Sequence, residues 1–129
     1  MMPPPDSDQE RAAHQSRAQQ HLLDAGASSL ARAPWLHPAQ PPPAADLVRF
    51  AVWRGQSGEV TEEDVQAALA LLPAARAEME QLETALLFTA RSLGLSWGRI
   101  GRWMGLGSAQ AAQQRFDRLT SRVEPSAGP

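Results

Sequence analysis

Side chains that can recognise nucleobases and phosphates are concentrated in residues 96–122, SWGRIGRWMGLGSAQAAQQRFDRLTSR. A glutamine amide can form two hydrogen bonds with adenine, and an arginine guanidinium can do the same with guanine or can hold a phosphate. We expect Arg115 and Arg118 to contact phosphates or guanine edges, and the glutamines to contact bases. The full set of candidate DNA-binding residues is Arg99, Arg102, Ser108, Gln110, Gln113, Gln114, Arg115, Arg118 and Arg122.

Two short helices joined by a Gly-Leu-Gly corner would bring these side chains to one surface. Ser96 is suited to cap the first helix, because its hydroxyl can accept a hydrogen bond from a backbone N–H of the first turn. Gly105 would end that helix, since glycine adopts a left-handed conformation at little cost. Gly101 lies where the second helix would cross closely, and Leu106 would fill the space under the turn.

A second helix is predicted over residues 108–122, with Ser108 as its cap and its polar face in the major groove of DNA. The stripe predicted to be buried consists of Ala112, Phe116, Leu119 and Val123. This combination of spacing, turn residues and side-chain types is typical of a helix-turn-helix over residues 96–122. The alternative is the polar, solvated face of an ordinary helical bundle, which the same side chains would also form.

The distribution of charge supports the same region. Residues 91–122 contain six arginines and one acid, a net charge of +5, although the whole chain carries −2. Residues 59–83 contain seven acids and one arginine, a net charge of −6. A polyanion would be attracted to the first segment and repelled by the second. We interpret the acidic segment as a solvated helix face.

A helical domain over residues 44–123 is predicted to hold the motif. A short helix would carry Leu47, Phe50, Val52 and Trp53 and stop at Gly55. Thr61 and Asp64 have the spacing of a reciprocal cap at the start of a second helix.

An apolar stripe follows that cap over nearly thirty residues. Its members are Val65, Leu69, Leu72, Met79, Leu82, Leu86, Ala90 and Leu93. Pro73 would kink the stripe or break it into helices near 62–72 and 74–93, because proline lacks a backbone N–H and restricts the residue before it. Gly94 would close the second helix. Trp103, on the less buried face of the first motif helix, is expected to pack on the helix over 74–93.

The N-terminal segment, residues 1–43, is predicted to be a disordered, proline-rich tail with a short helix near residues 8–24. It contains most of the chain's prolines and few large apolar side chains, so it has little surface to bury against the entropy of ordering. Trp35 and Leu36 are its bulky apolar pair; they could dock on a partner or fold back onto the domain. Residues 124–129 are predicted to form a second disordered tail.

Several function classes find no support in the composition. The chain has no cysteine and only three histidines, so we expect no metal site and no cofactor. No hydroxyl or carboxylate is arranged with the histidines for catalysis, and we expect no enzymatic activity. The sequence also lacks a long apolar run and a signal peptide, which predicts a cytoplasmic, nucleoid-associated protein that does not enter a membrane.

The segment from Asp64 to Arg122 resembles small helix-turn-helix proteins of GC-rich actinobacteria. The resemblance rests on a long Ala/Leu/acid helix followed by Ser96-Trp97, Ile100, Gly105-Leu106-Gly107-Ser108, Gln110-Ala111-Ala112, Arg115-Phe116 and Arg118-Leu119. It covers a little under half of the chain and implies an all-helical, bacterial DNA-binding domain. Two features depart from the pattern: the turn is one residue longer than in common repressors, and Pro73 interrupts the long helix.

The sequence therefore predicts an all-α protein, a helical bundle with a C-terminal helix-turn-helix, that binds double-stranded DNA sequence-specifically as a transcriptional regulator. The alternative is an adaptor that docks on a protein such as polymerase or a sigma factor. A homodimer through residues 47–72 is expected, because specificity in such proteins usually comes from pairing two half-sites. The competing arrangement is a monomer in which the helix over 47–55 covers the apolar stripe.

Overall fold

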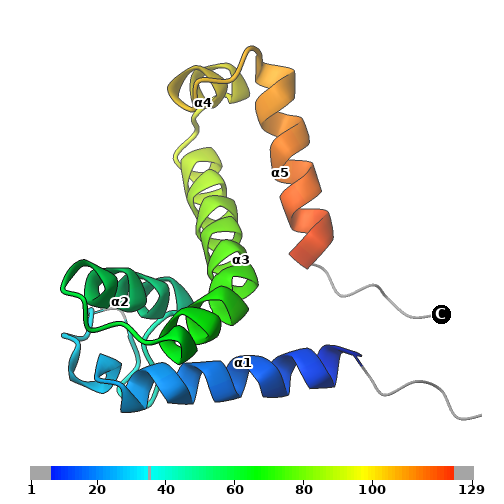
Figure 1. The fold of residues 1–129 in the computed structure, drawn as a ribbon. Coiled ribbons are helices and arrows are strands. Elements are labelled where there is room, and N and C mark those ends of the chain that lie inside the picture. The colour runs from blue at the N-terminus through cyan, green and yellow to red at the C-terminus, as the bar shows by residue number, and fades with distance from the viewer. Residues whose placement is uncertain (1–6, 35, 124–129) are drawn as a thin grey trace, which may run out of the picture. The chain divides into compact units, whose positions relative to one another are not determined.

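The computed structural model describes residues 7–34 and 36–123, with side chains to residue 121, and every regular element in these ranges is helical. The elements, shown in Figure 1, are α1 (Ser7–Asp24), the 3-10 turn η1 (Ala27–Ser29), α2 (Ala44–Gln56), α3 (Glu62–Ser92), α4 (Trp97–Trp103) and α5 (Ala109–Val123). The predicted all-α class is confirmed for this part of the chain. None of the described helices is both long and apolar enough to span a membrane.

The chain divides into two compact units, with the boundary between Glu78 and Met79. The N-terminal unit contains α1, η1, α2 and the first half of α3. The C-terminal unit contains the rest of α3 together with α4 and α5. Each unit has its own apolar core. The residues of the candidate site, which lie between positions 99 and 122, all belong to the C-terminal unit.

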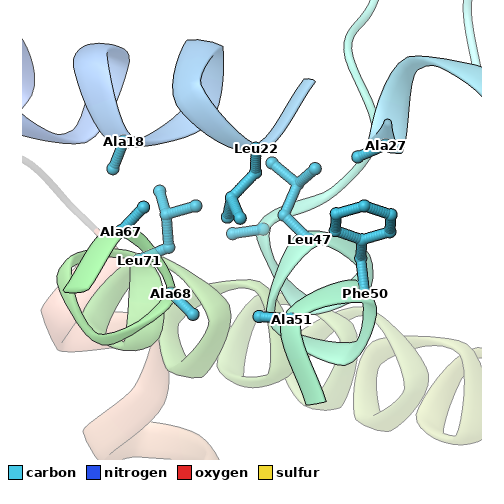
Figure 2. Close-up of a cluster of buried hydrophobic side chains, with 10 residues drawn as sticks. Ala18, Leu22, Ala27, Leu47, Phe50, Ala51, Ala67, Ala68 and Leu71 are labelled. Atoms are coloured by element: carbon cyan, nitrogen blue, oxygen red, sulfur yellow. The ribbon is translucent and has the colours of Figure 1, made fainter. Parts of the chain in front are cut away.

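Three helices and η1 meet in the core of the N-terminal unit (Figure 2). Leu22 of α1 and Leu47 of α2 are almost completely buried, and Phe50 lies beside Ala27 of η1. Helix α3 contributes Ala67, Ala68 and Leu71 to the same cluster. The many alanines let the helices approach closely, and the larger side chains fill the remaining space.

The N-terminal segment corrects the prediction of a disordered tail over residues 1–43. The helix expected near residues 8–24 is present as α1, but it is packed rather than part of a disordered tail, and it supplies Ala18 and Leu22 to the core. Two leucines and several alanines are enough because α2 and α3 offer an apolar surface for them. Residues 1–6 and 124–129, and Trp35, lie outside the described residues, whereas Leu36 is partly buried.

Carboxylates accept backbone N–H groups at the starts of α2 and α3. At the start of α3, the Thr61 N–H donates to Asp64 Oδ2 at 3.0 Å and the Asp64 N–H donates to Thr61 Oγ1 at 3.1 Å, so the predicted reciprocal cap is confirmed. His21 Nε2 lies 2.8 Å from Asp64 Oδ1 and ties α1 to this cap. At the start of α2, the backbone N–H groups of Ala44 and Ala45 donate to the Glu78 carboxylate at 2.6 and 3.0 Å.

Helix α3 continues through Pro73, so of the two outcomes predicted there, a kink or a break into two helices, the break is wrong. A proline inside a helix removes one backbone hydrogen bond and crowds the preceding turn. Here the neighbouring Leu71, Ala74 and Ala75 pack in the core of the N-terminal unit, and this packing offsets the loss. The predicted ends of two helices are close to the observed ones. Gly94 follows α3 with a φ of 86°, as expected for the glycine that closes a helix. Helix α2 ends at Gln56, one residue after the predicted Gly55, and the left-handed residue after it is Gly58.

The face of α3 that is buried differs from the predicted stripe. In the stripe, Val65, Leu69, Met79, Leu82, Leu86 and Leu93 are all exposed. The cores instead take Ala67, Ala68 and Leu71 in the N-terminal unit and Leu87 in the C-terminal unit. The predicted stripe, which was chosen from the largest apolar side chains, is thus left at the surface. In the N-terminal unit, the buried face of α3 includes two alanines that this choice left out.

Candidate nucleic-acid interface

The candidate site rests on the apolar core of the C-terminal unit. Leu87 of α3, Ile100 of α4, and Ala112 and Leu119 of α5 form its buried centre. Trp97 and Phe116 pack against this centre, with their ring centroids 5.5 Å apart and their planes tilted. Helix α5 packs through Ala112, near its start, and Leu119, nearer its end. The face that carries these two residues is therefore the one turned toward the core.

Both helices of the predicted motif start as expected. The Ser96 hydroxyl accepts a hydrogen bond from the Arg99 N–H at 3.2 Å, and the Ser108 hydroxyl accepts one from the Ala111 N–H at 3.1 Å. Neither helix has an acid in its first turn. Serine satisfies the first N–H groups without bringing a negative charge, so the N-terminus of α5 retains its positive potential.

The corner between α4 and α5 depends on two glycines. A Cβ atom built on Gly101 would lie 2.8 Å from the Ser108 carbonyl oxygen, so a larger residue would push the two helices apart. Gly105 has a φ of 75°, a left-handed conformation that other residues adopt only with strain. Leu106 lies under the turn, partly buried against the core, and its N–H donates to the Gly101 carbonyl at 2.7 Å.

The outward face of α5 is polar. Gln110, Gln113, Gln114 and Arg118 are exposed on the side opposite Ala112 and Leu119. The remaining side chains of this face are Asp117 and Ser121, also exposed. Phe116 and Leu119, the large apolar side chains described on α5, are at least partly covered. The structure thus brings together the glutamines and Arg118 as the sequence predicted.

Arg115 does not belong to this face. Its guanidinium forms a two-pronged ion pair with the Glu83 carboxylate of α3, with Arg115 Nη2 at 2.9 Å from Glu83 Oε1 and a second bond from Nε to Oε2. The hydrogen bond from Arg115 holds the pKa of the Glu83 carboxyl below its ordinary value, although partial burial works against it. The assignment of Arg115 to a phosphate or a guanine therefore conflicts with the geometry, in which this side chain ties α5 to α3.

Helix α4 carries two further candidate arginines. Arg99 and Arg102 are both exposed, and the Arg99 guanidinium lies 5.0 Å from the centre of the Trp103 ring. Trp103 itself is 63% exposed, so the prediction that it packs on α3 is wrong. Leu87 and Trp97 already fill the space between α3 and α4, which leaves Trp103 on the outer side. Arg122 lies in α5, but its side chain is outside the described ones.

Comparisons with known proteins add no family to this geometry. No family model, no curated protein and no solved structure matches the chain. The resemblance to actinobacterial helix-turn-helix proteins remains an expectation from the sequence. The candidate site therefore has to be judged on its own residues.

Sequence reasoning missed two supporting residues of the site. Glu83 holds Arg115, and Arg91 lies over the Trp97 ring at 5.1 Å while it donates a hydrogen bond to the Leu95 carbonyl. The Glu83–Arg115 pair joins residues 32 positions apart, so the local sequence pattern does not predict it. Arg91 was visible only as part of the positive charge of the segment.

The three histidines lie in the N-terminal unit, outside the candidate site. Within the described residues, no group of three or more histidines, cysteines, aspartates or glutamates could hold a metal ion. His21 is engaged by Asp64, and His14 is exposed on α1.

Proposed function

We propose that this protein binds double-stranded DNA sequence-specifically and acts as a transcriptional regulator, with α5 in the major groove as the second helix of a helix-turn-helix. The observation that supports this most is the outward face of α5. It presents Gln110, Gln113, Gln114 and Arg118 together, on the side opposite the packed core. A helix fits the major groove, and amide and guanidinium side chains are the ones that read base edges there.

The charge around α5 suits a polyanion. The helix begins at a neutral serine cap without an acid in its first turn, and Arg99 and Arg102 of α4 are exposed in the same unit. Asp117 is the one acid among residues 91–122. Phosphate contacts would therefore come mainly from arginines, and they would hold the helix in register while the glutamines read bases.

The residues then divide by task. Gln110, Gln113 and Gln114 contact bases, and Arg118 contacts a phosphate or a guanine edge. Arg99 and Arg102 contact the phosphate backbone, and Ser108 caps α5. Arg115 keeps α5 in place through Glu83 rather than touching DNA. This differs from the sequence prediction in the roles of Arg115 and Ser108, and Arg122 stays a predicted DNA contact.

The test is fluorescence anisotropy with the full chain and a labelled random-sequence duplex at about 50 and 200 mM salt, a range over which phosphate contacts weaken strongly. Binding at low salt that falls steeply with salt is expected. Arg118→Ala should weaken binding about tenfold and lower the salt slope by about one. Arg17→Ala, which removes an exposed arginine of α1, is the matched control and should leave both unchanged.

The proposal fails if the chain does not bind the duplex at low salt, or if Arg17→Ala weakens binding as much as Arg118→Ala. Sequence readout has its own variant. Gln110→Ala should narrow the difference in affinity between a selected site and random DNA, with little change in the salt slope. A Gln110→Ala variant with unchanged preference would remove this glutamine from base readout.

A second candidate function is docking on another protein, and one observation favours it. Trp103 and Met104 are exposed at the end of α4, where a tryptophan is a common anchor in protein interfaces. If this function applies, Trp103→Ala would abolish capture of a partner such as polymerase and leave DNA affinity unchanged. If the DNA function applies, changes on α5 alter DNA binding regardless of Trp103.

A further inference from the structure

One face of α3 in the C-terminal unit is exposed although it is apolar. Met79, Leu82, Leu86 and Leu93 have exposed fractions of 63, 64, 69 and 76%, and Thr89 between them is also exposed. Leu93 follows the last residue of α3, but its N–H still donates to the Thr89 carbonyl at 3.0 Å and continues the helical turn. We call these five residues the α3 seam.

The spacing of the seam is that of a helix that pairs with another helix. Steps of three and four residues alternate from Met79 to Leu93, as at the a and d positions of a coiled coil. No charged residue interrupts these positions. Side chains exposed by chance on a solvated helix face would have no reason to follow this alternation over two heptads.

The C-terminal unit already uses a different face of α3. Glu83, Leu87 and Ala90 contact α5 and the core, and at 3.6 residues per turn they lie roughly a quarter of a turn away from the seam. Helix α3 therefore has one face for its own unit and a second apolar face beside it.

Residues 1–6 and 124–129 are poorly suited by their composition to cover the seam. Residues 124–129 (EPSAGP) contain no large apolar side chain, and residues 1–6 (MMPPPD) contain three consecutive prolines, which cannot continue a helix paired along the seam. Beside the seam lie Ala85, Ala90 and Ser92, which are small and neutral, and two glutamates, Glu78 and Glu83. The Glu78 carboxylate is bound to the start of α2 and the Glu83 carboxylate to Arg115, so a strongly charged partner helix would find little to pair with, and an identical seam is favoured.

We propose that the α3 seam pairs with the seam of a second copy of this chain, forming a twofold-symmetric dimer. A seam of this kind is self-complementary, because each apolar side chain can pack between those of an identical helix. Two heptads form a short interface, so a dissociation constant in the micromolar range is expected.

The location replaces the dimer interface predicted over residues 47–72. In the N-terminal unit, Leu47 and Phe50 of α2 share a core with Leu71 of α3, so these residues of the predicted interface are buried within the single chain. The competing arrangement, in which the helix over 47–55 covers the predicted stripe, is not what the structure shows, because the core takes a different face of α3. Val65 and Leu69 remain exposed there and serve as a control.

The dimer deepens the proposed DNA function and in that respect rests on it. Two copies would display two α5 helices related by a twofold axis, and the preferred DNA site would then be a palindrome. The dimer itself does not depend on DNA binding, and the two claims are measured separately.

The experiment is sedimentation equilibrium of the full chain, without DNA, from about 1 to 200 µM. A shift from the monomer mass of 13.9 kDa to twice that value is expected. In the double variant Leu82→Glu, Leu86→Glu the mass should stay at one chain, with the dissociation constant raised at least a hundredfold. Circular dichroism should show unchanged helix content, since both side chains are already exposed in the single chain.

Two controls give the test its precision. Phe88→Glu changes the same helix at a similarly exposed position, 66%, but almost opposite the seam, and Leu69→Glu changes the N-terminal unit. Both variants should dimerise like the unchanged chain. A monomer at every concentration, a dimer that survives the double variant, or equal disruption by Phe88→Glu would each overturn the proposal.

Failure of the dimer and failure of the DNA function are distinguishable. If the double variant is monomeric and binds a single half-site with the unchanged salt slope, but loses preference for a palindrome, both claims stand. If the chain dimerises and binds no DNA, only the DNA function fails. If it binds DNA as a monomer, only the dimer fails.

Discussion

The helices of the two units begin in different ways. In the N-terminal unit, α2 starts at the Glu78 carboxylate, and α3 starts at the Thr61 hydroxyl together with three acids, of which Asp64 accepts the Thr61 N–H. In the C-terminal unit, α4 and α5 start at the hydroxyls of Ser96 and Ser108, with no acid in either first turn. Both kinds of cap satisfy free N–H groups, but only the carboxylates also cancel the positive end of the helix dipole.

This difference assigns different tasks to the two units. Where the helix start is neutralised by the chain's own carboxylate, the charge serves to hold the fold together. At the start of α5, no carboxylate cancels the positive end of the helix dipole, so this positive potential remains available for an external anion. The exposed glutamines and Arg118 follow on the same helix. Three acids of the segment 59–83, Asp64, Glu78 and Glu83, thus serve the fold, and under the proposed function the basic segment is the one that meets DNA.

The strongest way to break the N-terminal unit alone is Leu22→Ala. Leu22 is fully buried, and removing such a side chain from a core costs about 3 kcal/mol. Hydrogen exchange should show loss of protection in α1 and α2 while α5 remains protected. Leu69→Ala, at an exposed leucine of α3, should change little. Full protection of α1 in Leu22→Ala would mean that the core of this unit does not depend on the N-terminal helix.

Gly101→Val should do the reverse and break the C-terminal unit. The new side chain would meet the Ser108 backbone oxygen, and overpacking of this kind costs roughly 3 kcal/mol. Loss of exchange protection should be confined to α4 and α5, and DNA binding should disappear with it. Gly107→Ala is the control, because a Cβ there has no neighbour within 4 Å. A Gly101→Val variant with intact protection would contradict the close crossing of α4 and α5.

Asp64→Ala should lower the free energy of unfolding of the N-terminal unit by about 2 kcal/mol, because it removes the carboxylate half of the reciprocal cap of α3 and leaves His21 without its partner. Glu63→Ala, beside it but exposed, should have a much smaller effect. Chemical denaturation monitored by circular dichroism measures both. Equal effects of the two variants would mean that general acidity at the helix start matters rather than the cap itself.

The same residue predicts a dependence on pH. The Thr61 N–H, and after it His21, hold the pKa of the Asp64 carboxyl below its ordinary value of 3.8. A carboxyl with a lowered pKa contributes its full stability above the unfolded value and loses it as the pH falls through the folded value. The difference in stability between the unchanged chain and Asp64→Ala should therefore shrink below pH 3.8.

The smallest effect is expected for Glu83→Gln, which releases Arg115. The ion pair is partly exposed, so its loss should cost about 1 kcal/mol or less. The freed guanidinium adds a positive charge near the DNA face, and DNA affinity should rise severalfold with a salt slope steeper by about one. Glu63→Gln in the N-terminal unit removes the same charge and should leave the slope unchanged. A shallower slope in Glu83→Gln would mean that the pair is needed to position α5.

The sequence predicted local features of this fold well and long-range ones poorly. The caps at Thr61, Ser96 and Ser108 and the close approach at Gly101 follow from residues only a few positions apart, and the structure confirms them. The role of Glu78 could not be predicted, because it caps a helix more than thirty residues earlier in the chain.

The errors have a common physical cause. Helix α1 was underestimated because its few apolar side chains are sufficient only when α2 and α3 cover them. The buried face of α3 was misplaced because periodicity favoured leucines, whereas close packing selected alanines. For the candidate site, the exposure of the glutamines was predictable from the period of α5, but the capture of Arg115 by Glu83 was not.

The central claim is that DNA contacts the C-terminal unit through the outward face of α5. Titration of the isotope-labelled full chain with a short duplex, followed by the backbone and side-chain amide signals in NMR spectra, tests it most directly. We predict that the largest shifts occur at Gln110, Gln113, Gln114 and Arg118 and that signals of α1 and α2 stay in place. Shifts concentrated on α1 or α2, with the signals of α5 unchanged, would contradict the account.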